Sequence, residues 1–185
     1  MEKKSMKKIA VIGPESTGKS TLSEQLAVHY KTQWVPEYAR EYLLQHGNKY
    51  TFDDLLIIAK NQFALEEKYI SEFRSGPSVS SNLLFMDTEM YVMKVWCEFV
   101  FGKCHRWVLD QIIERKYDLY LLCNTDLPWV KDELREYPDL KTRNQLYYIY
   151  KDIMINQPTP WVDISGDYDE RLQRAIQAID QLMAG

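Results

Sequence analysis

The chain has 185 residues, of which 45% are hydrophobic and 27% charged, as expected for a soluble protein with one domain spanning residues 1–185. Its net charge of −4 argues against a protein that holds nucleic acid through phosphate attraction, and no apolar stretch approaches the roughly 18 residues of a membrane span. The three cysteines form no C-x-x-C pair, so we expect reduced thiols in a cytoplasmic protein without nucleic-acid or membrane partners.

Short apolar runs alternate with helical patterns from the start of the chain. A strand is expected at 8–12, followed by a helix from about residue 18 whose apolar stripe runs through Leu22, Leu26 and Tyr30. A short strand at 33–35 and a helix at 37–45 come next, and Gly47 is a typical residue to end that helix. A long helix is then expected from 51 to about 73, followed by a polar loop at 75–81.

The same alternation continues to the end of the chain. It predicts a strand at 82–86, helices at 90–101 and about 105–115, a strand at 117–123, a helix at 140–155, a strand at 161–164 and a helix at 169–183. Strands that alternate with helices indicate an α/β fold with a parallel sheet covered on both faces. The polar segment 126–143 has no clean period, and long irregular segments in compact domains are often lids.

The segment Gly13–Ser20 matches the phosphate-loop pattern G-x-x-x-x-G-K-[ST], and Thr21 continues it. Its two glycines permit backbone angles that let successive N–H groups converge on phosphate oxygens, and the following helix adds the positive end of its dipole. The lysine would place positive charge on the outer phosphates, and the final serine would offer a hydroxyl to Mg²⁺. The pattern therefore predicts a nucleoside triphosphate site made of Gly13, Pro14, Glu15, Ser16, Thr17, Gly18, Lys19, Ser20 and Thr21.

Further side chains are candidates for chemistry around that loop. Asp87 ends a buried strand, where it could hold Mg²⁺ or instead cap the next helix. Glu37 follows a strand and a proline, where it could accept a proton from an attacking hydroxyl, hold sugar hydroxyls, or form a surface ion pair with Arg40. In the expected lid, Arg135 and Arg143 could cover a transferring phosphoryl group, or could be solvated loop charges.

Several segments together resemble the ribosylnicotinamide kinase domain of NadR-type proteins: GPESTGKSTL, WVPEYAREYL, MDTE, YDLYLL, LPWV with Arg135, and SGDYDER. They occur in that family's order from about Lys8 to Ala178. The resemblance implies a P-loop NTPase three-layer sandwich with five parallel strands in the order 2-3-1-4-5. It also implies that the γ-phosphate of ATP is transferred to the ribose 5′-hydroxyl of nicotinamide riboside, a small-molecule nucleoside, giving nicotinamide mononucleotide.

The resemblance assigns the catalytic positions to Lys19, Glu37, Asp87 and Arg135. It makes Gly13–Thr21 the ATP phosphate loop, puts Ser20 and Asp87 on the Mg²⁺ side, and places SGDYDER (165–171) near the adenine. Two departures leave details open. Glu89 stands where the family often has aspartate, and 132–134 replaces a glycine that is common before the lid arginine.

NadR-type proteins commonly join this domain to an adenylyltransferase domain, and some add a DNA-binding domain; we expect the kinase domain alone here. Two other functions stay open, namely a kinase for another nucleoside or nucleoside monophosphate and a non-catalytic ATP-binding regulator. The sequence leaves the acceptor, the purine preference and the oligomeric state undetermined. Four aromatic residues lie in segments near the expected substrate cleft, where they could contact a flat cationic nicotinamide ring or pack in the core: Tyr38, Tyr91, Trp96 and Trp129.

Overall fold

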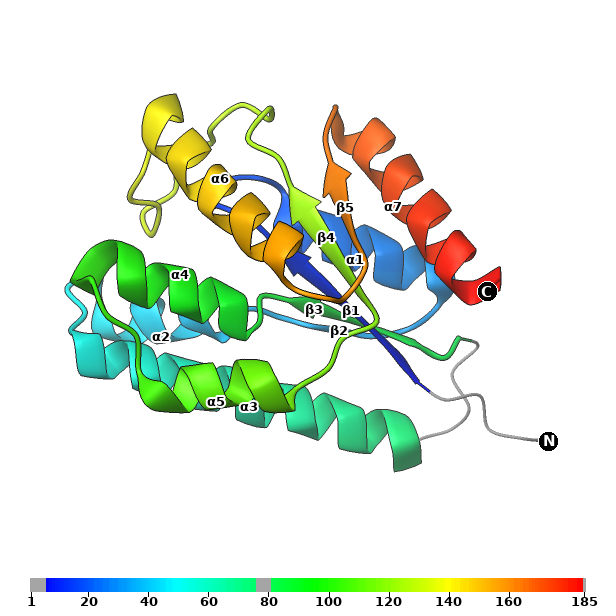
Figure 1. Cartoon of the computed structure of the whole chain (residues 1–185), viewed down its shortest axis with the longest axis horizontal. Helices are drawn as coiled ribbons and strands as arrows, with labels where there is room; N and C mark the ends of the chain where they lie inside the picture. The colour runs from blue at the N-terminus through cyan, green and yellow to red at the C-terminus, as the bar shows by residue number, and fades with distance from the viewer. Residues whose placement is uncertain (1–5, 76–80, 185) are drawn as a thin grey trace.

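The computed structural model describes residues 6–75 and 81–184. Its strands are β1 (Lys7–Ile12), β2 (Trp34–Val35), β3 (Leu83–Asp87), β4 (Leu119–Cys123) and β5 (Trp161–Ile164). Within the described residues all five pair in parallel, in a sheet with the order β2-β3-β1-β4-β5 (Figure 1). The α/β class and the strand order that the resemblance implied are therefore confirmed.

Helices connect successive strands and cover both faces of the sheet. They are α1 (Lys19–Tyr30), α2 (Tyr38–His46), α3 (Phe52–Ser75), α4 (Met90–Phe101), α5 (Arg106–Glu114), α6 (Leu140–Asn156) and α7 (Tyr168–Ala184). Helices α1 and α7 pack on one face and α3, α4 and α6 on the other, which makes the sheet the middle layer (Figure 1). Helices α2 and α5 pack with α3 and α4 in a separate apolar cluster.

Neighbouring residues of a strand pack against helices on opposite faces of the sheet. In β1, Ile9 and Val11 pack with Leu22 and Leu26 of α1, whereas Ala10 packs in the cluster that includes α4 and α6. Successive side chains of a strand point to opposite faces of the sheet. A continuous apolar run can therefore support two helical layers at once, as parallel sheets require.

Element boundaries agree with the sequence predictions to within two residues, with two local corrections in the middle of the chain. The strand expected at 117–123 begins at Leu119, and Tyr117 before it is buried with its hydroxyl donating to Glu66 at 2.9 Å. The end of the expected lid, 140–143, is the first turn of α6, because the Asp139 carboxylate caps this helix by accepting a hydrogen bond from the N–H of Thr142 at 2.7 Å.

Three smaller findings bear on the remaining expectations. Residues 76–80 of the expected loop at 75–81 lie outside the described residues. The three cysteines carry free thiols, and Cys97 and Cys123 are buried. Among the helices in the described ranges, none has the length and apolar character that crossing a bilayer requires.

The parallel sheet brings the loops that follow different strands together at one edge. The register aligns Val11 of β1 with Asp87 of β3, and Val35 of β2 with Met86. The segments that follow β1, β2 and β3 therefore leave the sheet side by side. Ligands of such folds bind at the carboxyl edge of the parallel sheet, so the candidate site is expected at this edge.

Candidate active site

Two glycines of the loop between β1 and α1 have backbone angles that residues with a side chain rarely adopt. Gly13 has φ of 138°, and a Cβ there would lie 2.7 Å from the carbonyl oxygen of Cys123. Gly18, with φ of 78°, is the N-cap residue directly before α1. The Thr17 hydroxyl donates to the carbonyl of Pro14 at 2.7 Å and closes the loop on itself. Such a loop, ending at a helix N-terminus, is suited to holding phosphate oxygens.

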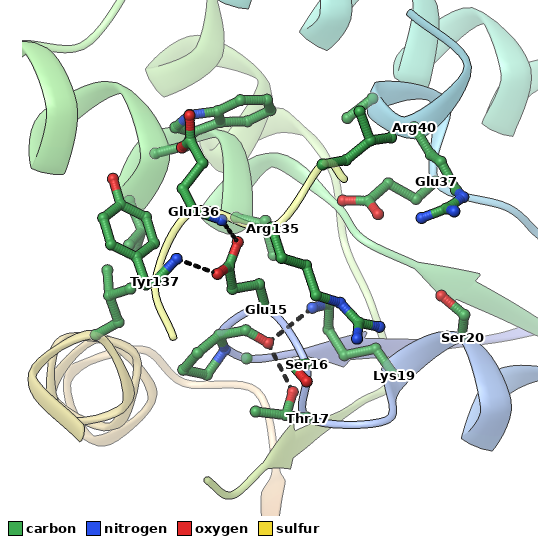
Figure 2. Close-up of a pocket in the computed structure, with 18 of the residues that line it drawn as sticks. Glu15, Ser16, Thr17, Lys19, Ser20, Glu37, Arg40, Arg135, Glu136 and Tyr137 are labelled. Atoms are coloured by element: carbon green, nitrogen blue, oxygen red, sulfur yellow. Dashed lines mark hydrogen bonds between the residues drawn. The ribbon is translucent and has the colours of Figure 1, made fainter. Parts of the chain in front are cut away.

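Lys19, Ser20 and Asp87 lie together beside this loop. The Lys19 ammonium donates to the carbonyl of Pro14 at 2.9 Å (Figure 2), and the Ser20 hydroxyl donates to Asp87 Oδ2 at 2.5 Å. The other carboxylate oxygen, Oδ1, is buried without a hydrogen-bond partner. Burial raises the pKa of Asp87 to about 7, and the charge of Glu37 adds to the rise while Lys19 and Ser20 oppose it.

This arrangement fits a divalent cation. A buried carboxylate oxygen that lacks a partner is costly, and a cation would supply one. Mg²⁺ is commonly held by one or two carboxylates together with substrate phosphates. Ser20 and Asp87 are the residues that could hold it here.

The alternative role considered for Asp87, capping the following helix, is performed by Glu89 instead. Glu89 is the N-cap of α4, and its carboxylate accepts a hydrogen bond from the N–H of Tyr91 at 2.8 Å. It is buried, and burial raises its pKa to about 8. The open question about Glu89 thus has a structural answer, since its side chain is used inside the fold.

Glu37 lies at the start of α2 and lines the same cleft as the phosphate loop (Figure 2). It makes no capping bond to its own helix, and its carboxylate accepts from the Thr88 hydroxyl at 3.4 Å. Arg40 does not form the ion pair with Glu37 that the sequence left open. Its guanidinium binds Asp132 of the opposite segment at 3.0 Å, so Glu37 keeps a carboxylate that faces the cleft.

The segment 124–139, between β4 and α6, contains no helix or strand, and its residues 134–137 line the cleft. We call it the lid. The carboxylate of Glu15 in the phosphate loop accepts hydrogen bonds from the N–H groups of Glu136 at 3.0 Å and Tyr137 at 2.5 Å (Figure 2). The Ser16 hydroxyl accepts from the N–H of Val130 at 3.1 Å. Glu15 was expected only as part of the phosphate site; its side chain instead holds the lid.

Lid residue Arg135 lies in the cleft as the sequence led us to expect. It lines the cleft together with Lys19 and Glu37, and Figure 2 shows its guanidinium directed toward Lys19. Among the residues that the structure describes, it donates one hydrogen bond, to the carbonyl of Val130 at 2.5 Å. The remaining donors of this guanidinium are therefore available to an anionic group.

Two other arginines are buried and support the loops from behind. Arg143, on α6, donates to the backbone carbonyls of Ser16, Thr125 and Leu127 at 3.2–3.4 Å; it is therefore neither a lid arginine nor a solvated charge.

Arg171, on α7, donates to the carbonyls of Thr17, Asn124 and Gly166 at 2.8–2.9 Å and pairs with Asp126. Sequence reasoning assigned no role to Arg171, although it ends the quoted motif SGDYDER. A guanidinium with five donors can join several loops in this way.

Part of the cleft lining, which we call the aromatic end, is apolar and aromatic. The cleft encloses about 240 Å³. Of the four aromatic candidates only Trp96 lines it, whereas Tyr38, Tyr91 and Trp129 do not; the aromatic residues that line it within the described ranges are Trp96, Phe99, Tyr137 and Tyr150. Helical spacing in the 90–101 segment could have indicated Phe99 beside Trp96. Tyr137 and Tyr150 come from the lid and α6, and only the tertiary fold brings them there.

The chain is similar to proteins of known structure or function. A family model described as "AAA domain" matches residues 8–171. The "Trifunctional NAD biosynthesis/regulator protein NadR" of Escherichia coli (strain K12) is 26% identical over 176 residues, which cover 95% of this chain and 42% of that protein.

Two solved structures share the fold. A crystal structure of NadR protein in complex with NR aligns with a TM-score of 0.74 and 20% identity, over 97% of this chain and 52% of that chain. A deoxyadenosine kinase from M. mycoides aligns with a TM-score of 0.63 and 12% identity, over 94% and 99% of the two chains. The chain thus spans about half, or less, of the NadR proteins that it matches.

Proposed function

This chain belongs to the AAA domain family, whose model covers residues 8–171, and we propose that it is an ATP-dependent kinase acting on nicotinamide riboside. The NadR matches, which confirm the resemblance in the motifs, support this acceptor. The product would be nicotinamide mononucleotide, formed by phosphorylation of the ribose 5′-hydroxyl. The observation that carries the proposal is one cleft that combines a phosphate loop, the Glu37 carboxylate and an aromatic end.

The phosphate loop and the lid would hold the donor. The backbone of Gly13–Thr21 and the N-terminus of α1 would bind the phosphates of ATP. Lys19 and Arg135 approach this end of the cleft from opposite sides (Figure 2). Positive groups that are already in place stabilise charge on a transferring phosphoryl group without the cost of reorganising water. When Mg²⁺ is bound at Ser20 and Asp87, it would neutralise further charge on the outer phosphates.

Glu37 would serve the acceptor. Its carboxylate lines the cleft and is not paired with Arg40, so it can accept a proton or a hydrogen bond from a ribose hydroxyl. The aromatic end offers flat apolar surface, led by Trp96. A cationic pyridinium ring is favoured on such a surface. The acceptor that suits both features is a riboside with a positively charged base.

An acceptor that already carries phosphate fits less well. A nucleoside monophosphate needs cations near Glu37, and Arg40 is the local candidate. That guanidinium is held by Asp132 at 3.0 Å. The carboxylate of Glu37 would in addition repel a phosphate at short range. A thymidylate kinase has the same fold, with 14% identity and a TM-score of 0.62. This match supports the fold alone, so the choice of acceptor rests on the residues of the site.

The test is a coupled ADP-release assay with Mg²⁺-ATP and a panel of nucleosides and nucleotides. We expect turnover with nicotinamide riboside and none with nicotinamide mononucleotide. Glu37→Gln should lower kcat by about 10²–10³, the range typical of a lost general base, while ATP still binds. Glu41→Gln, which neutralises an exposed glutamate on the same helix outside the cleft, should leave kcat unchanged.

Two results would change the assignment. Faster phosphorylation of a nucleoside monophosphate such as thymidylate would identify a nucleotide kinase. ATP binding without turnover of any acceptor would identify a non-catalytic regulator.

A further inference from the structure

Two consecutive lid residues carry opposite charges into different parts of the cleft. Arg135 and Glu136 both line it, and Figure 2 shows their side chains diverging, with Arg135 directed toward Lys19 and Glu136 pointing away from it. The backbone between them is held in place, because the N–H of Glu136 donates to Glu15 at 3.0 Å. One docked segment therefore delivers a cation to the phosphate end and a carboxylate to the aromatic end.

The Glu136 carboxylate is positioned by Tyr50, which in turn is bonded to Trp96 of the aromatic end. The Tyr50 hydroxyl donates to Glu136 Oε2 at 2.8 Å, and the indole N–H of Trp96 donates to the Tyr50 oxygen at 2.9 Å. The rings of Tyr50 and Trp96 pack edge to face with centroids 5.0 Å apart. This chain of bonds leaves the second carboxylate oxygen, Oε1, without a hydrogen bond among the described contacts of Glu136.

The other charges in the cleft have different surroundings. Within the described residues its charged lining consists of Glu15, Lys19, Glu37, Arg40, Arg135 and Glu136. The carboxylate of Glu15 is taken up by two lid N–H groups, and Arg40 is paired with Asp132. Of this set, Glu136 is the one that is bonded to the aromatic pair formed by Tyr50 and Trp96.

We propose that Glu136 selects the charge of the acceptor's base, favouring a cationic pyridinium and disfavouring a base that bears a carboxylate. The inference rests on the proposed kinase function and adds to it a residue that decides between related ribosides. A fixed negative charge beside a partly desolvated ring attracts a cation. The same charge repels a carboxylate on the ring, as specificity through a repulsive element requires.

Three ribosides of similar shape but different base charge can test this proposal. Nicotinamide riboside carries a cationic ring, and its 1,4-dihydro form has the same ribose and amide but no charge. Nicotinic acid riboside keeps the cationic ring and has a carboxylate in place of the amide. Steady-state kcat and KM would be measured for each with wild type, Glu136→Gln and Glu133→Gln. Glu133 is a matched control, because it is an exposed glutamate of the same lid that does not line the cleft.

In wild type we expect kcat/KM for nicotinamide riboside to exceed that for each of the other two ribosides by about 10-fold, a factor equivalent to about 1.4 kcal/mol. Glu136→Gln should bring the three values to within about 3-fold, mainly through KM, and raised ionic strength should reduce the wild-type preference. Glu133→Gln should keep the wild-type ratios. Tyr50→Phe, which removes the bond that positions Glu136, should give an intermediate ratio.

The outcomes distinguish this inference from the function on which it rests. If nicotinamide riboside is phosphorylated but Glu136→Gln keeps the wild-type ratios, the inference is wrong and the kinase assignment stands. If Glu133→Gln changes the ratios as much as Glu136→Gln, general lid charge explains selectivity and the inference is also wrong. If no riboside is phosphorylated, the proposed function fails and the inference fails with it.

Discussion

Replacing Glu15 with alanine would remove the carboxylate that joins the phosphate loop to the lid. That carboxylate accepts the N–H groups of Glu136 at 3.0 Å and Tyr137 at 2.5 Å. Hydrogen bonds to a charged group contribute about 1.5–3 kcal/mol each, and the exposure of the lid favours the lower value. Loss of both should therefore cost about 3 kcal/mol of lid docking, or on the order of 10² in the population of the docked lid.

The consequence should appear in catalysis more than in ATP binding. Arg135 directly precedes the two lid residues that Glu15 holds, so an undocked lid removes this guanidinium from the phosphate end. In the proposed function, ATP phosphates would be held by backbone N–H groups of the loop, which a side-chain change at position 15 leaves in place. We expect Glu15→Ala to lower kcat/KM by about 100-fold and to change the Kd for ATP by less than about 3-fold.

Glu15→Gln should have an intermediate effect. Its amide oxygen can still accept one lid N–H, whereas its NH₂ group would face the second donor. A loss of about 10-fold in kcat/KM corresponds to one such bond. Glu24→Ala, which removes an exposed glutamate from α1, is the control and should be silent. If folded Glu15→Ala keeps kcat/KM within about 3-fold of wild type, Glu15 does not hold the lid in the working enzyme.

Three further changes test other parts of the site. Lys19→Ala should lower phosphoryl transfer by at least about 10³-fold and leave the fold intact by circular dichroism, because the side chain lies outside the core; near-normal turnover would exclude a catalytic phosphate loop. Arg135→Ala should lower kcat by about 10²–10³, or about 2–4 kcal/mol, with little change in ATP affinity, whereas Lys131→Ala in the same lid should not; equal effects would make Arg135 an ordinary loop charge. Arg171→Met should destabilise the protein by about 3–5 kcal/mol in urea unfolding, because it removes a buried charged donor from three backbone carbonyls and from the ion pair with Asp126, and the exposed Arg174→Met is its control; a loss below about 1 kcal/mol would contradict this role.

The elements that the sequence predicted well are those whose signal is local. Each buried strand is a short apolar run between turn residues, and each helix carries an apolar stripe at helical spacing, so the pattern is complete within one segment. The phosphate loop belongs to the same class, because its two glycines, its lysine and its serine lie within eight residues. The strand order came from the resemblance, since local patterns carry no information about which strands become neighbours.

In the candidate site, too, the sequence indicated the residues with a local signal and missed the long-range contacts. The sequence indicated Lys19, Glu37, Asp87 and Arg135, because each lies at a recognisable position in a motif or at the end of a strand. It did not indicate that Arg40 pairs with Asp132 across the cleft, 92 residues away. It also placed Arg143 in the lid, although the residue is buried on α6 beneath the phosphate loop. A charged residue in a polar segment looks the same in sequence whether it is solvated or buried.

The sequence by itself thus determined the fold class, the order of the elements and a nucleotide site, because these follow from short-range patterns of apolar residues, glycines and helix caps. The tertiary structure alone decided how the cleft is closed and what its acceptor end is made of. The carboxylate of Glu15 meets the lid 122 residues further along the chain, and Arg171 reaches the carbonyl of Thr17 across 154 residues. Such contacts depend on where the sheet places its connecting loops, which the residues on either side of each loop do not encode.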